Sequence, residues 1–186
     1  MSTNNRTAAM KSNIRLFGSV KVMVICAMLI AISIIGKSLR IDAGTVIRIS
    51  FENLPIIMAG VFFGPYIGAA VGLCADLIGC MVTSQAPLPF ITVGVVAVGF
   101  MAGFVYQNLP KAKLLTRVAC SAGIAHLIGN VIIKTAALYF AFPGMRPTLI
   151  FRPVNYIIIA AIESTLIYLL LSNKAFAEQI RKLCSK

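Results

Sequence analysis

The fold is decided by residues 51–79, FENLPIIMAGVFFGPYIGAAVGLCADLIG. This stretch is almost wholly apolar, and its glycines recur every four residues, at Gly60, Gly64, Gly68 and Gly72. Four-residue spacing puts small residues on one helix face, where two backbones can approach closely in lipid. Pro65 interrupts the helical hydrogen bonding between the two halves. The stretch therefore predicts two membrane helices, joined near Pro65, that pack tightly against each other.

The rest of the chain shares this apolar character. Of its 186 residues, 59% are hydrophobic and 12% are charged, whereas a soluble domain carries about 25% charged residues. The charges are uneven, with 17 Lys and Arg against 5 Asp and Glu and a net charge of +12. This composition excludes a soluble globular domain, a disordered chain and a typical DNA-binding module, and it favours an integral membrane protein.

Working outward from residues 51–79, we expect an all-α integral membrane protein in which residues 1–186 form a single domain of six transmembrane helices. One span needs about 20 apolar residues, so six spans leave only short loops. The first span follows a basic N-terminal segment without a clear cleavage site, so we expect it to be retained. The expected spans are residues 18–38, 52–63, 66–82, 91–106, 117–142 and 154–171.

The distribution of Lys and Arg predicts the orientation in the membrane. With the N-terminus inside, eleven cations flank the inner side, and Lys134 falls within a span. The outer side is flanked by five: Lys37, Arg40, Arg48, Arg146 and Arg152. This bias predicts that both termini lie in the cytoplasm of a multi-pass protein of the cell membrane.

Polar side chains interrupt three of the expected spans. They are Asp76 in the third span, His126, Asn130 and Lys134 in the fifth, and Asn155 and Glu163 in the sixth. A charge at the membrane centre costs at least about 2.5–3.5 kcal/mol, so these groups should face the bundle interior or a wet cavity. Spacings of four and eight residues align the members of each span along one stripe. Two compatible hypotheses follow: Lys134 pairs with Glu163 or Asp76 to hold the bundle together, or the cluster binds a ligand.

Depth along the helices places part of this cluster near the outer face. Lys134 lies 17 residues beyond Arg117, which is about 25 Å along a helix. Aromatic residues gather at the same level: Phe51, Phe90, Tyr139, Phe142, Phe151 and Tyr156. Cations beside aromatic faces suit a flat, anionic, ring-containing molecule, although each aromatic also fits an interfacial belt.

Motifs of other chemistries are missing from the sequence. There is no G-x-x-x-x-G-K-[ST] loop, so the chain does not hydrolyse ATP itself. There is also no HExxH or GxSxG motif, and the five cysteines form no CxxC pair. We therefore expect neither an enzyme nor a metal site, a cofactor or a disulfide framework.

The block at residues 51–79 resembles the S components of energy-coupling factor (ECF) transporters. An F-x-x-L-P-I run from Phe51 is followed by G-x-x-x-G-P-x-x-G from Gly60 and by G-x-x-x-D-x-x-G from Gly72. This order is most similar to the folate-type group. The resemblance implies a bacterial substrate-binding protein that captures folate or a related anionic vitamin outside the cell. It also implies that a separate T component with two ATPase subunits drives uptake.

The resemblance assigns roles to two further regions. Ala27 and Ala31 match an A-x-x-x-A face that docks on the T component in the family, whereas spacing alone favours packing inside the bundle. The loop at residues 39–50 corresponds to the segment that caps the pocket. Folate-specific members carry Asn-Thr-x-Trp in span five, but residues 130–135 here read NVIIKT and the chain has no Trp. A related vitamin or precursor therefore stays open beside folate.

These arguments yield a set of candidate binding residues. We expect the ligand's charges and polar edges to be bound by Arg48, Asn130, Lys134 and Arg152. We expect its ring to pack on Phe51, Tyr139 and Tyr156. Further candidates, which also fit structural roles, are Asp76, His126, Asn155 and Glu163. The competing classes are a self-sufficient carrier or channel, which would transport without ATPases, and a membrane enzyme.

Overall fold

The computed structural model of the chain describes residues 18–39, 41–43, 47–49, 51–110, 112–141, 152–173, 175 and 178–180. For residues 41–49, 141, 152 and 154 within these ranges, only the backbone is considered below. The principal helices are α2 (Val20–Ser38), α3 (Asn53–Phe63), α4 (Pro65–Val82), α5 (Pro89–Asn108), α6 (Leu114–Ala125), the π-helix η1 (His126–Ile133), α7 (Lys134–Ala141) and α9 (Arg152–Ser172). The predicted helical architecture is therefore confirmed.

Five helical stretches are long and apolar enough to cross a membrane. They are Val20–Ser38, Pro65–Val82, Pro89–Asn108, Leu114–Phe140 and Asn155–Ser172. Five of the predicted spans thus coincide, to within a few residues, with helices that could cross a membrane. The predicted span at residues 52–63 is also helical, but α3 has 11 residues. A helix of that length rises about 16 Å, against a hydrocarbon core about 30 Å thick. The structure thus places only a short apolar helix at this position.

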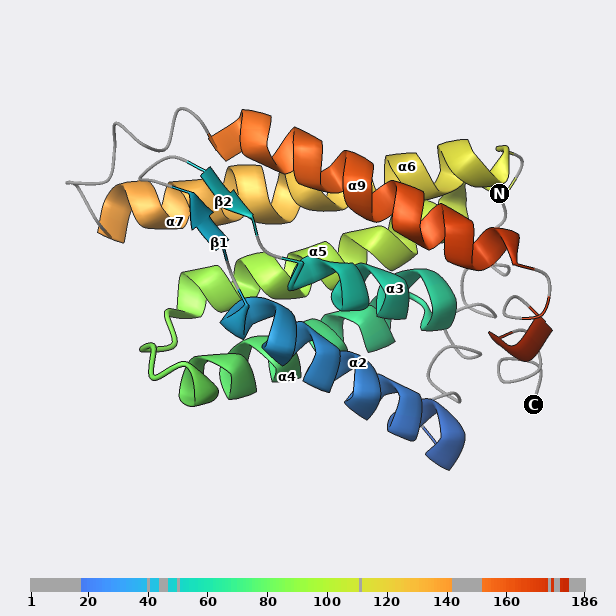
Figure 1. The fold of residues 1–186 in the computed structure, drawn as a ribbon, viewed down its shortest axis with the longest axis horizontal. Coiled ribbons are helices and arrows are strands. Elements are labelled where there is room, and N and C mark those ends of the chain that lie inside the picture. Colours follow the sequence, from blue (N-terminus) through green and yellow to red (C-terminus); the bar gives the residue numbers. More distant parts are fainter. Residues whose placement is uncertain are drawn as a thin grey trace.

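The helices run roughly along the long axis of the molecule (Figure 1). The continuous rod formed by α6, η1 and α7 lies beside α9, while α2 lies against α3 and α4. Helix α2 begins, and α9 ends, at the end of the bundle opposite the β-hairpin (Figure 1). The C-terminal end of α2 and the starts of α3 and α5 lie at the hairpin end.

Glycines bring α3, α4 and α5 into backbone contact. Gly64 joins α3 to α4 with φ of 96°, a left-handed conformation that favours glycine. A Cβ atom on Gly60 or on Gly68 would lie 2.5 Å from the carbonyl oxygen of Gly99 in α5. A Cβ on Gly68 would also lie 2.6 Å from the Cα of Gly60. The predicted packing of α3 on α4 is confirmed, and α5 is a third partner that the motif spacing did not indicate.

The segment between α2 and α3 contains a short antiparallel hairpin. Strand β1 (Ile41–Ala43) pairs with β2 (Ile47–Ile49), and Asp42 lies opposite Arg48. The resemblance to the S components implied only a capping loop over residues 39–50. Three-residue strands are too short to give a visible two-residue periodicity, which explains why the hairpin was not foreseen.

Candidate functional site

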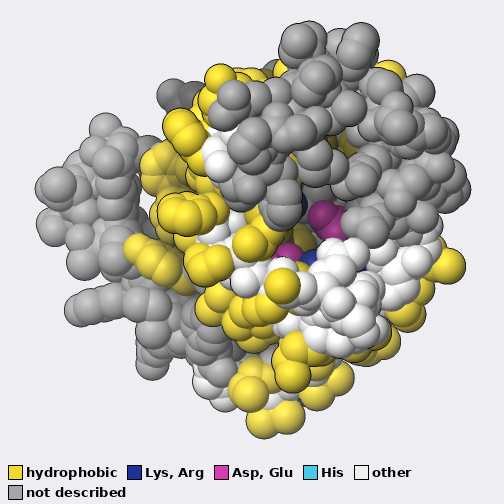
Figure 2. Space-filling model, turned by 90° about the vertical axis from the view of Figure 1, so that its left-hand side faces the viewer, with side chains coloured by type: hydrophobic (Ala, Val, Ile, Leu, Met, Phe, Trp, Pro, Cys, Tyr) yellow, Lys and Arg dark blue, Asp and Glu magenta, His cyan; other side chains and the backbone are white. Residues whose placement is uncertain are grey.

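A polar cavity opens at the hairpin end of the bundle. Figure 2, which views this end, shows acidic and basic side chains in a hollow among apolar ones. The cavity has a volume of about 210 Å³. It is lined by Lys37, Glu52, Asn53, Asp76, Cys80, Gln85, Ala86, Leu88, Ile91, Lys134, Leu138, Tyr156 and Ile159. These residues come from six helices, from Glu52 directly before α3, and from the connection between α4 and α5.

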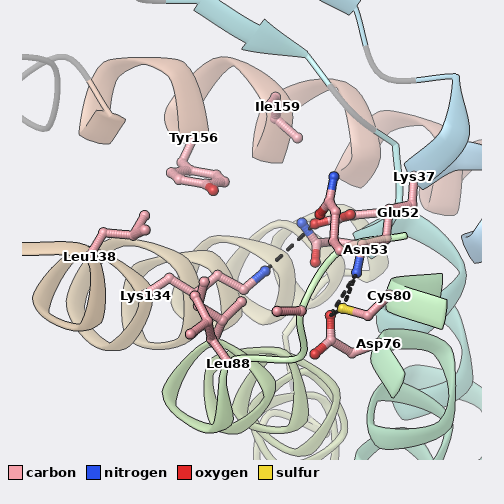
Figure 3. Close-up of a pocket in the computed structure, with 13 residues that line it drawn as sticks. Lys37, Glu52, Asn53, Asp76, Cys80, Leu88, Lys134, Leu138, Tyr156 and Ile159 are labelled. Atoms are coloured by element: carbon pink, nitrogen blue, oxygen red, sulfur yellow. Dashed lines mark hydrogen bonds and ion pairs between the residues drawn. The ribbon is translucent and has the colours of Figure 1, made fainter. Parts of the chain in front are cut away.

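One side of the cavity is closed by an ion pair between α2 and α4. Lys37 Nζ lies 2.9 Å from Asp76 Oδ1 and 3.2 Å from Cys80 Sγ (Figure 3). The second carboxylate oxygen, Asp76 Oδ2, accepts a hydrogen bond of 2.7 Å from Thr92 in α5. Gly79 leaves room for the lysine, because a Cβ there would lie 3.0 Å from Lys37 Cδ. We call Lys37, Asp76, Cys80 and Thr92 the locked cluster, since its members satisfy one another across three helices.

A second ion pair crosses the cavity more loosely. Lys134, at the start of α7, is 5% exposed, and its Nζ lies 3.6 Å from Glu52 Oε1 (Figure 3). This distance exceeds the usual 2.7–3.2 Å of a hydrogen bond. Within the described part of the chain, Lys134 Nζ makes no other ion pair and no hydrogen bond. Gly94 gives the lysine stem its path, because a Cβ there would lie 2.6 Å from Lys134 Cγ.

A buried polar network lies next to the cavity. His126 Nε2 and Glu163 Oε2 are 2.6 Å apart, and Asn130 Nδ2 lies 2.8 Å from His126 Nδ1. All three side chains are at most 2% exposed. The ring of Tyr156, which lines the cavity, stacks on His126 with centroids 5.8 Å apart. The network thus supports the cavity wall through Tyr156.

The predicted partners of Lys134 were wrong. Neither Glu163 nor Asp76 pairs with it, because His126 engages Glu163 and Lys37 engages Asp76 at shorter distances. Glu52 takes their place. The regular four-residue stripe is also interrupted, since His126 and Asn130 lie in a π-helix and Lys134 begins the next α-helix. π-Helical turns often occur at functional sites.

The structure brings together only part of the predicted binding set. Asp76, Lys134 and Tyr156 line the cavity, and His126, Asn130 and Glu163 are buried beside it. Outside the cavity lining are Phe51, which is 40% exposed, Tyr139, which is 45% exposed, and the half-buried Asn155. The side chains of Arg48 and Arg152, together with Phe142 and Phe151, lie outside what the structure describes.

Sequence reasoning missed several residues that line the cavity or tie its wall. The sequence pattern marks Lys37 only as one of the outer cations, and it marks Glu52 and Asn53 only as part of residues 51–79. Their positions carry a signal, because Glu52 and Asn53 form a polar pair directly before a buried apolar helix. Asn53 is 2% exposed, and its Oδ1 has no hydrogen-bond partner in the described part of the chain. No group of three or more metal-ligating side chains occurs among the described residues.

The first helix presents a second feature at the surface. Ala27 and Ala31 are both exposed on α2, where the buried residues are Val22, Leu29 and Ser33. The expectation from spacing alone, that these alanines pack inside the bundle, was therefore wrong. Packing inside the described part of the chain does not account for the small-residue face, so it is available for contact with another molecule.

Known proteins match both the sequence and the fold. The sequence pattern of the family described as "ECF transporter, substrate-specific component" matches residues 21–177. The folate transporter FolT of Clostridium novyi (strain NT) is 26% identical over 151 residues, which cover 80% of this chain and 87% of that protein.

Two solved structures share the fold. A crystal structure of FolT bound with folic acid superimposes with a TM-score of 0.64 at 20% identity, covering 84% of this chain and 95% of that one. The S component of a bacterial ECF transporter superimposes with a TM-score of 0.66 at 20% identity, covering 83% and 95%.

Proposed function

Because the chain belongs to the family of ECF transporter substrate-specific components, we propose that it captures folate or a closely related anionic vitamin in the cavity at the hairpin end. Membership of this family makes it a transporter component and not an enzyme. The proposal concerns its substrate, the site that holds it and the partners that drive uptake.

The observation that carries the proposal is that Lys134 is buried with only one loose ion pair. An ammonium group that is 5% exposed and has one ion pair at 3.6 Å is poorly compensated for its burial. It points into a cavity that also presents the ring of Tyr156 (Figure 3). A ligand with a carboxylate and a flat ring could pair its carboxylate with Lys134 and pack its ring on Tyr156. Charge-assisted hydrogen bonds to a carboxylate are among the stronger ones. Arg48 and Arg152 stay candidates for further charge contacts.

The relatives support folate as the first ligand to test. The curated relative is named as a folate transporter, and one of the similar structures holds folic acid. The cavity of about 210 Å³ is below the roughly 300–1,000 Å³ usual for small-molecule sites. A vitamin with two or more rings would therefore extend out of the cavity, on the side of the molecule where the sequence places further outer cations.

We also propose the membrane topology and the partners. In this arrangement α3 and α4 together count as two of six spans, both termini lie in the cytoplasm of a bacterial cell, and the cavity faces outward. The exposed Ala27 and Ala31 on α2 provide the face that docks on a T component, which works with two ATPase subunits. The excess of Lys and Arg flanking the cytoplasmic side supports this orientation.

The substrate proposal is tested by calorimetry on the purified chain. Folic acid is expected to bind at one site, and the ligand that co-purifies should be identified as a folate by mass spectrometry. If folic acid gives no heat but another vitamin does, the substrate assignment fails and the family assignment stands. A self-sufficient carrier is the alternative class. Uptake of folic acid into liposomes that contain this chain alone would favour it over the ECF proposal.

A further inference from the structure

Asn53 places a buried amide in the wall of the cavity. Its side chain is 2% exposed and lines the cavity together with Lys134 and Tyr156 (Figure 3). Asn53 Oδ1 has no hydrogen-bond partner among the residues that the structure describes. Most buried side-chain oxygens in proteins have such a partner, because burial without one is unfavourable. An acceptor in this state is suited to a donor that arrives with the ligand.

The start of α3 does not use this amide as a helix cap. An asparagine at a helix N-terminus usually accepts a hydrogen bond from an N–H group of the first turn. Here the N–H of Leu54 donates to the carbonyl oxygen of Phe51 at 3.3 Å, and Pro55 has no N–H. Capping of α3 therefore does not explain why Asn53 occupies this buried position.

The donors of the locked cluster are directed to other acceptors. Lys37 Nζ donates to Asp76 Oδ1 at 2.9 Å and to Cys80 Sγ at 3.2 Å. The hydroxyl of Thr92 donates to the second oxygen of Asp76 at 2.7 Å. The cluster therefore satisfies its own carboxylate and leaves Asn53 Oδ1 to the contents of the cavity.

The chemistry of the cavity indicates which ligand group fits this oxygen. An amide oxygen only accepts, so the ligand must donate. Asn53 and Tyr156 line the same volume of about 210 Å³, so a ring that packs on Tyr156 brings its edge close to Asn53. An amino group projects from the edge of a ring and can reach an acceptor set in the wall. Folic acid carries such a group on its two-ring head.

We propose that Asn53 Oδ1 accepts a hydrogen bond from an amino group on the ring of the ligand. Asn53 is then a specificity-determining residue, because a ring with a carbonyl oxygen at that place would set two acceptors against each other. Lys134 and Asn53 together select a molecule that carries both an acid and an amino-substituted ring. This inference rests on the proposed function, since it names the ligand chemistry that the same site selects.

Calorimetry with two matched ligands tests the contact. The second ligand is 2-deamino-2-hydroxyfolic acid, in which a carbonyl oxygen replaces the amino group of folic acid. The unmodified chain should bind it about 10-fold more weakly than folic acid, because a hydrogen bond to Asn53 is lost. N53L should bind both ligands with equal, reduced affinity. Equal affinities in the unmodified chain, or a preference for folic acid that persists in N53L, would overturn the proposal.

Thermal unfolding of the ligand-free chain separates this role from a structural one. N53L replaces a buried polar group by an apolar one, so the melting temperature should stay the same or rise. N130L is the matched control, because Asn130 is 0% exposed and its Nδ2 lies 2.8 Å from His126 Nδ1. Its melting temperature should fall. A similar fall in N53L would make Asn53 a structural residue and overturn the proposal.

The folate assignment can fail separately from the role of Asn53. If folic acid does not bind the unmodified chain, 2-amino-4-oxopteridine and 2,4-dioxopteridine present the same difference without the acidic tail. A larger rise in the melting temperature with the amino compound, lost in N53L, would support Asn53 and reject only folate as the substrate. Equal rises with the two compounds, or none, would reject the role of Asn53 as well.

Discussion

The contact between α3, α4 and α5 and the cavity at the hairpin end are built from the same stretch of chain, yet they differ in how tightly they are filled. In the middle of that stretch, Gly60 and Gly68 leave no room for a single added carbon against α5. At its two ends, Glu52 and Asp76 face an open volume of about 210 Å³. Residues 51–79 thus provide a close-packed platform and, at either end of it, side chains for a binding site. Substitutions in the close-packed region should therefore lower the stability of the chain, whereas substitutions in the cavity should change ligand binding.

The largest expected effect is a loss of stability when the close packing of α3, α4 and α5 is disturbed. G68A should destabilise the purified chain by about 3 kcal/mol, at the upper end for overpacking, because the new Cβ meets the backbone of α5 and of α3. Thermal unfolding in detergent measures this change. The matched control is G123A in α6, where a Cβ meets nothing within 4 Å, and there the higher helix propensity of alanine should keep or raise the melting temperature. Equal melting temperatures for the two variants would contradict the close-packed contact.

Next in size is the loss of the cation in the cavity. K134M should weaken the binding of folic acid roughly 10- to 100-fold, because a charge-assisted hydrogen bond to the ligand is lost. The melting temperature should change little, since Lys134 makes only one loose ion pair. K113M, which removes an exposed lysine before α6, serves as the control and should bind normally. Unchanged affinity of the K134M protein would show that Lys134 does not bind the ligand.

A smaller effect is expected from the locked cluster. D76N should lower the stability by about 1.5 kcal/mol, because Lys37 loses the charge of its partner while Thr92 keeps a hydrogen-bond acceptor. The affinity for folic acid should fall less than in K134M. Chemical or thermal unfolding and calorimetry on the same preparation measure both quantities. A larger loss of affinity than of stability would place Asp76 among the ligand contacts.

The smallest effect on the isolated chain is expected on α2. A27L and A31L change exposed positions, so the stability and the affinity for folic acid should stay within about 0.5 kcal/mol of the unmodified chain. Uptake of folic acid by liposomes that contain the complete transporter should nevertheless fall, because a bulky leucine blocks close helix packing with a partner. Normal uptake with both leucines in place would show that the T component docks elsewhere.

The sequence predicted the helices better than it predicted the site. Long apolar runs and the positions of Pro65 and Gly64 are local signals, so the helix bounds agree with the structure to within a few residues. Lys134 and Tyr156 were found because a polar or aromatic side chain stands out in an apolar run. The pairing of Lys134 with Glu52 was missed because it joins residues 82 positions apart, and no periodicity encodes which carboxylate lies nearest. The contribution of Lys37 was missed for the same reason, since its partner depends on how α2 crosses α4.

The central claim is that Lys134 binds an acidic group of the substrate in the cavity at the hairpin end. A crystal structure of the chain with folic acid tests it most directly. We expect a ligand carboxylate within hydrogen-bond distance of Lys134 Nζ, with the Lys37–Asp76 pair unchanged. Folic acid bound elsewhere, with the Lys134–Glu52 pair still in place, would contradict the account.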